Sequence, residues 1–118
     1  MGQLLWRPTK ESIRQSNMYQ FLQRVNATYH LHLSDFGSLY EWSVNHIAEF
    51  WAVMWDYADI VCSQPYHQVI DDVGKMPGAK WFSGSRLNFA QNLLRYRDDH
   101  TALIFNGESQ VHRTLTYA

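Results

Sequence analysis

A stripe of large apolar side chains between His46 and Ala58 constrains the fold of this chain more than any other feature. Apolar residues follow one another at steps of three and four, the period of one face of an α-helix. They are Ile47, Phe50, Trp51, Met54, Trp55 and Ala58. Apolar burial contributes on the order of 25 cal/mol per Å², so we expect this helix to anchor the core. Truncating Trp51 or Trp55 to Ala should then cost roughly 3–5 kcal/mol. The alternative role for the two indoles is to line a ligand pocket.

Two further helices are expected before this stripe. Thr9 is a candidate N-cap for the first, which keeps a helical period from Met18 onward and should end near Tyr29 or His30. The second should begin around Ser34 and Asp35, or at Ser38, where Glu41 three residues later matches a capping box.

The second half of the chain changes in character. Residues 64–85 contain many turn formers, so an irregular connection with a short strand at Val69–Ile70 is expected. Ser85 can cap a fourth helix over Leu87–Arg95, with Leu87, Ala90, Leu93 and Leu94 available for burial. Residues 99–118 indicate a β-hairpin, because an apolar run at 102–105 and a β-branched segment flank Asn106-Gly107-Glu108-Ser109.

These elements define a mainly α (α+β) fold of about four helices followed by a hairpin. We expect a helical N-terminal domain at residues 1–98 and, at 99–118, the start of a larger domain. A two-stranded hairpin is marginal by itself and leaves its edges bare. Its sheet should therefore extend from near Asp99 past Ala118, and the chain reads as truncated.

Composition excludes several classes of partner. Ten Lys and Arg residues oppose eleven Asp and Glu residues, which gives a net charge of −1 with no block of like charges. This balance argues against binding nucleic acid or an anionic membrane. The sequence has no apolar run of 18 residues, no signal-like start and a single cysteine, Cys62. A cytoplasmic protein is expected.

A search for chemistry yields no catalytic, cofactor-binding or metal-binding residue. The histidines have no metal-site spacing with Cys or carboxylates; they are His30, His32, His46, His67, His100 and His112. Cys62 is read as a small hydrophobe, and Asp71–Asp72 as a solvated loop rather than paired acids. Residues 78–86 combine Gly, Ser and basic residues before a helix, as a phosphate cradle would, but a turn that caps the helix explains them better.

The segment Met76–Leu94, MPGAKWFSGSRLNFAQNLL, resembles the N-terminal region of acyl-CoA synthetases, closest to the acetoacetyl-CoA synthetases. The resemblance extends backward to Leu5–Thr9, Ser16–Met18 and Trp42–Trp51, and forward to Ala102–Phe105 and Leu115–Ala118, so it covers most of the chain. Acetyl- and propionyl-CoA synthetases typically continue Asn-Cys-Leu-Asp-Arg-His where residues 92–97 read NLLRYR. That departure favours the acetoacetyl branch.

The resemblance implies an enzyme that adenylates acetoacetate with Mg-ATP and then passes the acyl group to CoA. The family's phosphate loop, nucleotide contacts and C-terminal lysine all fall outside these residues, so the fragment alone is expected to be inactive. The implied role is structural: the N-terminal segment folds against the large adenylating domain and the hairpin leads into it. Contact of Gly84, Ser85 or Arg86 with CoA in the full enzyme stays open.

Two alternatives remain at this point. The chain could begin another short-chain acyl-CoA synthetase, such as one for acetate or propionate. It could also be a stand-alone helical module whose tryptophan-rich face docks a protein partner. If the chain is a truncated synthetase, the apolar patch exposed on its hairpin should favour self-association of the fragment, whereas a stable monomer would support the stand-alone module.

Overall fold

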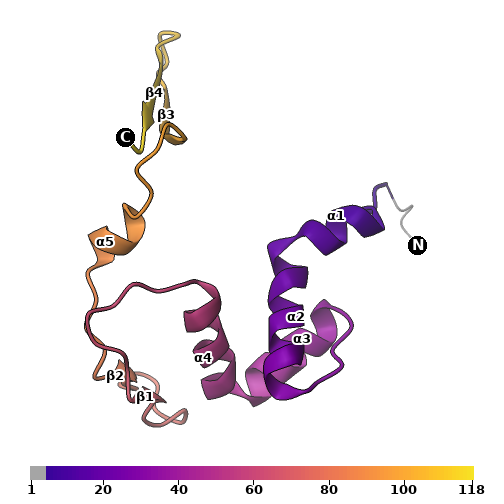
Figure 1. The fold of residues 1–118 in the computed structure, drawn as a ribbon. Helices are drawn as coiled ribbons and strands as arrows, with labels where there is room; N and C mark the ends of the chain where they lie inside the picture. The colour runs from indigo at the N-terminus through magenta and orange to yellow at the C-terminus, as the bar shows by residue number, and fades with distance from the viewer. Residues whose placement is uncertain (1–4) are drawn as a thin grey trace. The chain divides into compact units, whose positions relative to one another are not determined.

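A computed structural model describes residues 5–118, which form two compact units (Figure 1). The helical unit comprises residues 5–60 and 66–83. The hairpin unit comprises residues 61–65 and 84–118. The expected boundary between residues 98 and 99 stays a prediction. Among the described residues, no helix is both long and apolar enough to cross a bilayer.

The helical unit begins with two helices where one was expected. Helix α1 (Lys10–Gln15) is capped by Thr9, as predicted, and α2 (Asn17–Tyr29) ends at His30, which takes a left-handed conformation with φ 55°. Between them Ser16 is extended, with ψ 145°, and its hydroxyl accepts a hydrogen bond from the Tyr19 amide at 3.2 Å. This second cap divides the segment and brings the described helices to five.

Helix α3 (Phe36–Asn45) begins where Ser34 and Asp35 predicted it. The Asp35 carboxylate accepts a hydrogen bond from the Ser38 amide at 2.8 Å, and the Ser38 hydroxyl accepts one from the Asp35 amide at 3.2 Å. This is a reciprocal capping box. The alternative start at Ser38 is wrong, because Ser38 is the third residue of the helix. Helix α4 (Ile47–Tyr57) matches the predicted apolar segment.

The core of the helical unit lies where α2, α3 and α4 meet. Its buried residues are Phe21, Leu22, Val25, Leu39, Trp42 and Val53. The expectation that this stripe anchors the core is confirmed for Phe50 and Met54 and wrong for Trp51, which is 41% exposed, while the buried residue of α4 is Val53. Helix α4 uses two faces: Phe50, Met54 and Tyr57 pack on the core, and the two indoles turn to a short sheet.

That sheet pairs β1 (Gln68–Ile70) with β2 (Trp81–Ser83) in antiparallel register, Gln68 opposite Ser83 and Ile70 opposite Trp81. The expected strand at Val69–Ile70 is confirmed, whereas β2 lies in a segment expected to be irregular. Three residues are too short for an alternating pattern to show, so only the pairing across the sheet identifies β2.

The hairpin unit contains α5 (Phe89–Leu93), β3 (Thr101–Asn106) and β4 (His112–Thr116). The predicted hairpin is confirmed, with Leu103 opposite Leu115. The predicted helix is shorter than expected and is capped by Asn88 rather than Ser85, because the Asn88 side chain accepts the Gln91 amide at 3.0 Å. The leucines expected to be buried, Leu87, Leu93 and Leu94, are all exposed.

A single β-bridge joins the two segments of the hairpin unit, residues 61–65 and 84–118. Arg86 and Gln64 form a β-bridge, in which the Arg86 amide donates to the Gln64 carbonyl at 2.9 Å and the Ser63 amide donates to the Arg86 carbonyl at 2.8 Å. The segment expected to cap a helix therefore pairs with an extended strand instead.

Candidate functional site

An apolar groove in the helical unit is the first candidate site. It runs between the α3–α4 corner and the loop that joins β1 to β2, it is open to solvent, and its volume is about 560 Å³. The Trp51–Trp81 groove, as we call it, is lined by Ser43, Val44, Ile47, Phe50, Trp51, Ile70, Val73, Lys75, Met76, Pro77, Gly78, Ala79 and Trp81. One of the two indoles of the apolar stripe thus lines a pocket, which was the alternative left open by the sequence.

Aromatic ring contacts hold the sheet on α4. Trp51 meets Trp81 edge to face with ring centroids 5.9 Å apart, and Trp55 meets Tyr66 and Phe82 at 5.2 and 4.7 Å. Such pairs contribute about 0.5–1.5 kcal/mol each beyond burial. Burial among these rings, and the nearby Asp56 carboxylate, raise the pKa of the Tyr66 phenol. The indoles therefore attach β1 and β2 to the helices.

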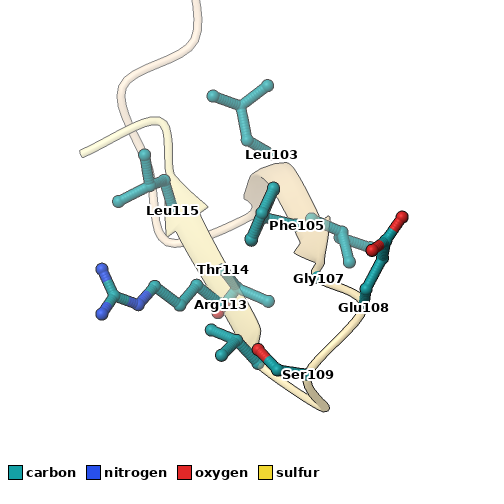
Figure 2. A pocket seen from close by; sticks show the side chains of 10 residues that line it. Leu103, Phe105, Gly107, Glu108, Ser109, Arg113, Thr114 and Leu115 are labelled. Atoms are coloured by element: carbon teal, nitrogen blue, oxygen red, sulfur yellow. The ribbon is translucent and has the colours of Figure 1, made fainter.

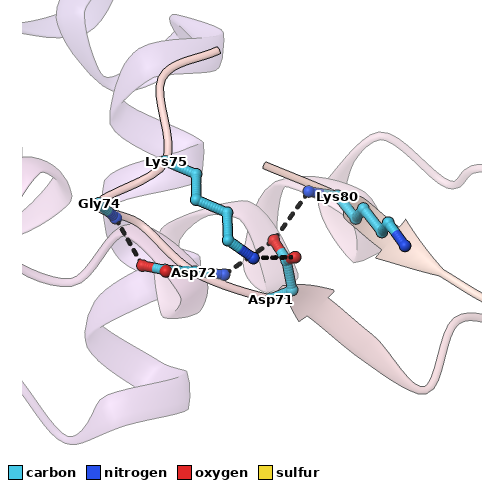
Figure 3. Close-up of polar contacts among 5 residues, drawn as sticks. All are labelled: Asp71, Asp72, Gly74, Lys75 and Lys80. Carbon is cyan, nitrogen blue, oxygen red and sulfur yellow. Dashed lines mark hydrogen bonds and ion pairs between the residues drawn. The ribbon is translucent and has the colours of Figure 1, made fainter. Parts of the chain in front are cut away.

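The loop that forms one wall of the groove is organised by Asp71 (Figure 3). One carboxylate oxygen accepts the Lys80 and Asp72 amides at 2.8 Å each, and the other accepts the Lys75 ammonium at 3.0 Å. These bonds hold the pKa of Asp71 at about 2, below its ordinary 3.8, with the Lys80 amide the largest cause. The solvated-loop interpretation omitted this role, since Asp71 organises the loop with its side chain.

Two backbone amides of residues 78–86 already donate hydrogen bonds within the protein. The Lys80 amide donates to Asp71, and the Arg86 amide donates to Gln64. Residues 81–83 form β2, and the next helix starts only at Phe89. Two of the amides that a cradle would use are therefore occupied, and the turn at Gly84, with φ 87°, connects a strand to the Gln64–Arg86 bridge.

A second candidate is the apolar side of the β3–β4 hairpin (Figure 2). The pairs Leu103–Leu115 and Phe105–Arg113 place these four residues on one face. Leu103, Phe105 and Leu115 are 63%, 59% and 62% exposed, and a cavity of about 1120 Å³ lies against them. Clustered exposed apolar residues of this size mark a contact surface.

The remaining residues singled out by the sequence are dispersed. Across residues 5–118, no group of three or more His, Cys, Asp and Glu side chains is placed to hold a metal ion. Cys62 is a half-buried free thiol. His46 stacks on Trp42 with centroids 5.6 Å apart, and His112 pairs with Asn106 across the hairpin. None of these contacts assembles a reactive group.

Sequence reasoning missed most of the groove. Val73 and Met76 lie in a loop that was read only as a run of turn formers, although both are large apolar residues that the loop leaves exposed. The sequence signal that could have indicated this wall of the groove was the presence of apolar residues beside the Gly and Pro turn formers.

Comparison with known families identifies the class of the central segment. Residues 36–93 match the family described as the acetyl-coenzyme A synthetase N-terminus. This segment therefore belongs to that family, and the resemblance to acyl-CoA synthetases is confirmed.

The most informative relatives are named acetoacetyl-CoA synthetases. The protein from Gallus gallus is 39% identical over 107 residues, 88% of this chain and 15% of its own length; that from Xenopus tropicalis is 40% identical over 106 residues, 89% and 16%. A malonamoyl-CoA synthetase from Penicillium aethiopicum is 41% identical over 93 residues, 78% of this chain and 13% of its own. The chain thus spans less than a fifth of the length of these relatives.

A solved structure has the same fold. The acetoacetyl-CoA synthetase from Streptomyces lividans is 33% identical and superposes with a TM-score of 0.83, covering 98% of this chain and 18% of that protein. Both the helical unit and the hairpin unit therefore have counterparts in one acetoacetyl-CoA synthetase.

Proposed function

We propose that this chain is the N-terminal, non-catalytic part of an acetoacetyl-CoA synthetase, an acid–thiol ligase. The observation that carries the proposal is the match to the structure from Streptomyces lividans, which covers 98% of the chain. Named acetoacetyl-CoA synthetases from three vertebrates match at 37–40% identity in support. The complete protein would make acetoacetyl-CoA from acetoacetate, ATP and CoA, a step of ketone-body and lipid metabolism in the cytoplasm.

The chemistry of that reaction explains why the segment contributes no catalytic residue. A carboxylate is a poor electrophile, and joining it to AMP gives a leaving group that the CoA thiol can displace. That first step needs cationic groups and donors around the phosphates, supplied together with Mg²⁺. Among the described residues, the segment rich in Gly and basic residues already uses two backbone amides as donors: Lys80 donates to Asp71, and Arg86 donates to Gln64. ATP, Mg²⁺ and CoA are therefore assigned to the rest of the enzyme.

The hairpin unit provides the contact with that remainder. Leu103, Phe105 and Leu115 stand on one exposed face, and both outer edges of the two-stranded sheet are open to further strands. We assign this surface to the adenylating domain of the same protein, and to self-association when that domain is missing. Nucleic acid and membranes are not proposed as partners.

A second candidate function follows from the malonamoyl-CoA synthetase. Its 41% identity is as high as that of the acetoacetyl-CoA synthetases, so the same N-terminal segment serves ligases for different short acids. Acetate and propionate ligases belong to this second candidate. A stand-alone interaction module is a third, and it requires a natural protein of about this length.

The test is substrate-dependent exchange of pyrophosphate into ATP, with acetoacetate, acetate, propionate and malonamate offered in turn. The complete gene product should exchange with acetoacetate, and the 118-residue chain should not exchange with any acid. Preference for another acid would move the protein to the second candidate. Exchange with no acid would overturn the ligase proposal altogether.

A further inference from the structure

The Trp51–Trp81 groove has the size and lining of a small-molecule site. Its volume of about 560 Å³ falls within the range of roughly 300–1,000 Å³ typical of ligand pockets. Apolar and aromatic side chains form most of its walls, with Ser43 and Lys75 as the polar exceptions. Pockets that bind organic ligands combine such walls with a small number of polar groups.

Two of the polar groups that line the groove, Ser43 and Lys75, already donate a hydrogen bond within the protein. In the described part of the chain, neither the Trp51 nor the Trp81 indole N–H donates a hydrogen bond, and the Ser43 hydroxyl donates to the Tyr40 carbonyl at 2.7 Å. Lys75 is the one charged residue among those lining the groove. Its ammonium has three N–H donors, of which Asp71 takes one, and its side chain is 49% exposed. The groove therefore has, beside its apolar surface, one ammonium group that is paired with Asp71 and keeps two further N–H donors.

Asp71 fixes the position of this charge. Its carboxylate binds the Lys75 ammonium and, through the Lys80 amide, the far end of the same loop (Figure 3). Lys75 is thus held by the loop that carries Val73, Met76 and Pro77 into the groove wall. A ligand carboxylate at Lys75 would meet a cation that is already positioned, which lowers the entropic cost of binding.

We propose that the Trp51–Trp81 groove binds a monocarboxylate with an extended apolar body, such as a medium-chain fatty acid. The carboxylate pairs with Lys75, and the hydrocarbon lies on Trp51, Trp81 and Val73. This site is separate from the ligase chemistry and does not rest on the proposed function. Its ligand needs an apolar body, so acetoacetate is too short to fill it.

The test uses the indole N–H signals of the 118-residue chain in ¹H–¹⁵N correlation spectra. All five tryptophans lie outside the hairpin unit, so a ligand on the hairpin face moves none of these signals directly. Trp51→Phe and Trp81→Phe each remove one signal and thereby assign it. Octanoate should shift the Trp51 and Trp81 signals in a saturable way and leave that of the core residue Trp42 in place.

Chemical controls separate the two halves of the proposed contact. Acetoacetate and acetate carry the charge without the apolar body, and octylammonium carries the body with the opposite charge. Acetoacetate and acetate should leave the signals unmoved, and octylammonium should bind at least tenfold more weakly than octanoate. Equal binding of octanoate and octylammonium would overturn the role of Lys75.

Variants of Lys75 provide the decisive comparison. Lys75→Met should weaken octanoate about tenfold, and Lys75→Arg, which keeps the charge, should restore most of the affinity. Val73→Asp places a negative charge on the wall and should abolish binding, whereas Val111→Asp on the hairpin should not. Spectral dispersion reports whether each variant is folded, and Val73→Asp, which leaves the Asp71–Lys75 pair intact, serves if Lys75→Met unfolds the loop.

The last experiment repeats the octanoate titration with the complete gene product. If the remainder of the protein or a second copy covers the groove, octanoate will leave the Trp51 and Trp81 signals of the complete protein unchanged, which overturns the proposal. Pyrophosphate exchange by the Lys75→Met protein should equal that of the parent. Loss of octanoate binding with unchanged exchange separates a failure of this site from a failure of the ligase proposal.

Discussion

Asn92 and Val61 form a reciprocal pair of hydrogen bonds in the hairpin unit. The Val61 amide donates to the Asn92 side-chain oxygen at 2.8 Å, and the Asn92 side-chain nitrogen donates to the Val61 carbonyl at 2.8 Å. Asn92 also belongs to the segment that resembles acyl-CoA synthetases in both the acetoacetyl and the acetyl branch. An amide side chain is required here because it alone presents a donor and an acceptor side by side. The residue thus holds an extended segment, and no reaction chemistry is needed to explain it.

Replacing Asn92 by Ala should destabilise this attachment. The substitution leaves the half-buried Val61 amide and carbonyl unpaired, at a cost of about 1–3 kcal/mol. Hydrogen exchange at the Val61 amide is the direct measurement, and its protection should fall. Gln91→Ala is the matched control, because the exposed Gln91 side chain contributes no hydrogen bond in the described structure. Equal protection of Val61 in Asn92→Ala and the parent would contradict this role.

Phe21 should contribute more to stability than Trp51, although Trp51 is the larger residue. Phe21 is 4% exposed and contacts the rings of Phe50 and Tyr57 edge to face. Phe21→Ala should cost about 3–5 kcal/mol, and Trp51→Ala about 1–2 kcal/mol, because the stabilisation follows the area removed from water. Urea unfolding monitored by helical circular dichroism compares the two variants. The reverse order would show that the sheet, and not the three-helix core, anchors the helical unit.

The helices could be predicted from the sequence because their signals are local. Thr9 and Asp35 cap as their residue types suggest, and the spacing of three and four places α4 within one residue at each end. The face that α4 buries was less predictable. A helix covered on two sides carries apolar residues around most of its circumference, so Trp51 and Val53 look equally suited to the core until the position of the sheet is known.

The helix start in the second half of the chain was predicted wrongly for a different reason. More than one residue there could form the capping hydrogen bond. Ser85 and Asn88 both precede an apolar run and both can cap a helix, yet Arg86 between them pairs with Gln64, which keeps residue 86 extended. Competition by a segment more than twenty residues away has no local signature. The groove escaped prediction for the same reason, because the β1–β2 loop and the α3–α4 corner meet only in the folded unit.

Asp71 should make the β1–β2 loop sensitive to acid within a narrow window. Its folded pKa of about 2 lies below its ordinary 3.8, so its hydrogen bonds stabilise the loop fully above about pH 4. This contribution is lost as the pH falls toward 2, when the carboxylate is protonated. The carboxyl carbon resonance of Asp71 should titrate near pH 2, and protection of the Lys80 amide should fall over the same range.

Two variants check this assignment. Lys75→Met removes the ammonium partner and should raise the pKa of Asp71 toward its ordinary value, while the bond from the Lys80 amide remains. Asp71→Asn keeps an acceptor for that amide but has no charge to titrate, so Lys80 protection should no longer change between pH 4 and 2. A midpoint near 3.8 in the parent protein would show that these bonds do not persist in solution.

The hairpin face should govern self-association of the 118-residue chain. Leu103 and Phe105 are exposed and lie on one face of β3, so replacing either by Asp removes no buried contact and should change the unfolding free energy by less than about 0.5 kcal/mol. It should, however, shift the chain toward monomer in sedimentation velocity, because the added charge must be desolvated when two apolar faces meet. Gln91→Asp, at an exposed position of α5, is the matched control, because it adds the same charge outside β3 and β4, and it should leave the oligomer distribution of the parent. If Leu103→Asp and the parent sediment alike, this face does not mediate association. If the parent is already a monomer at high concentration, the apolar face does not self-associate. That result would weaken the assignment of this face as the contact with the adenylating domain.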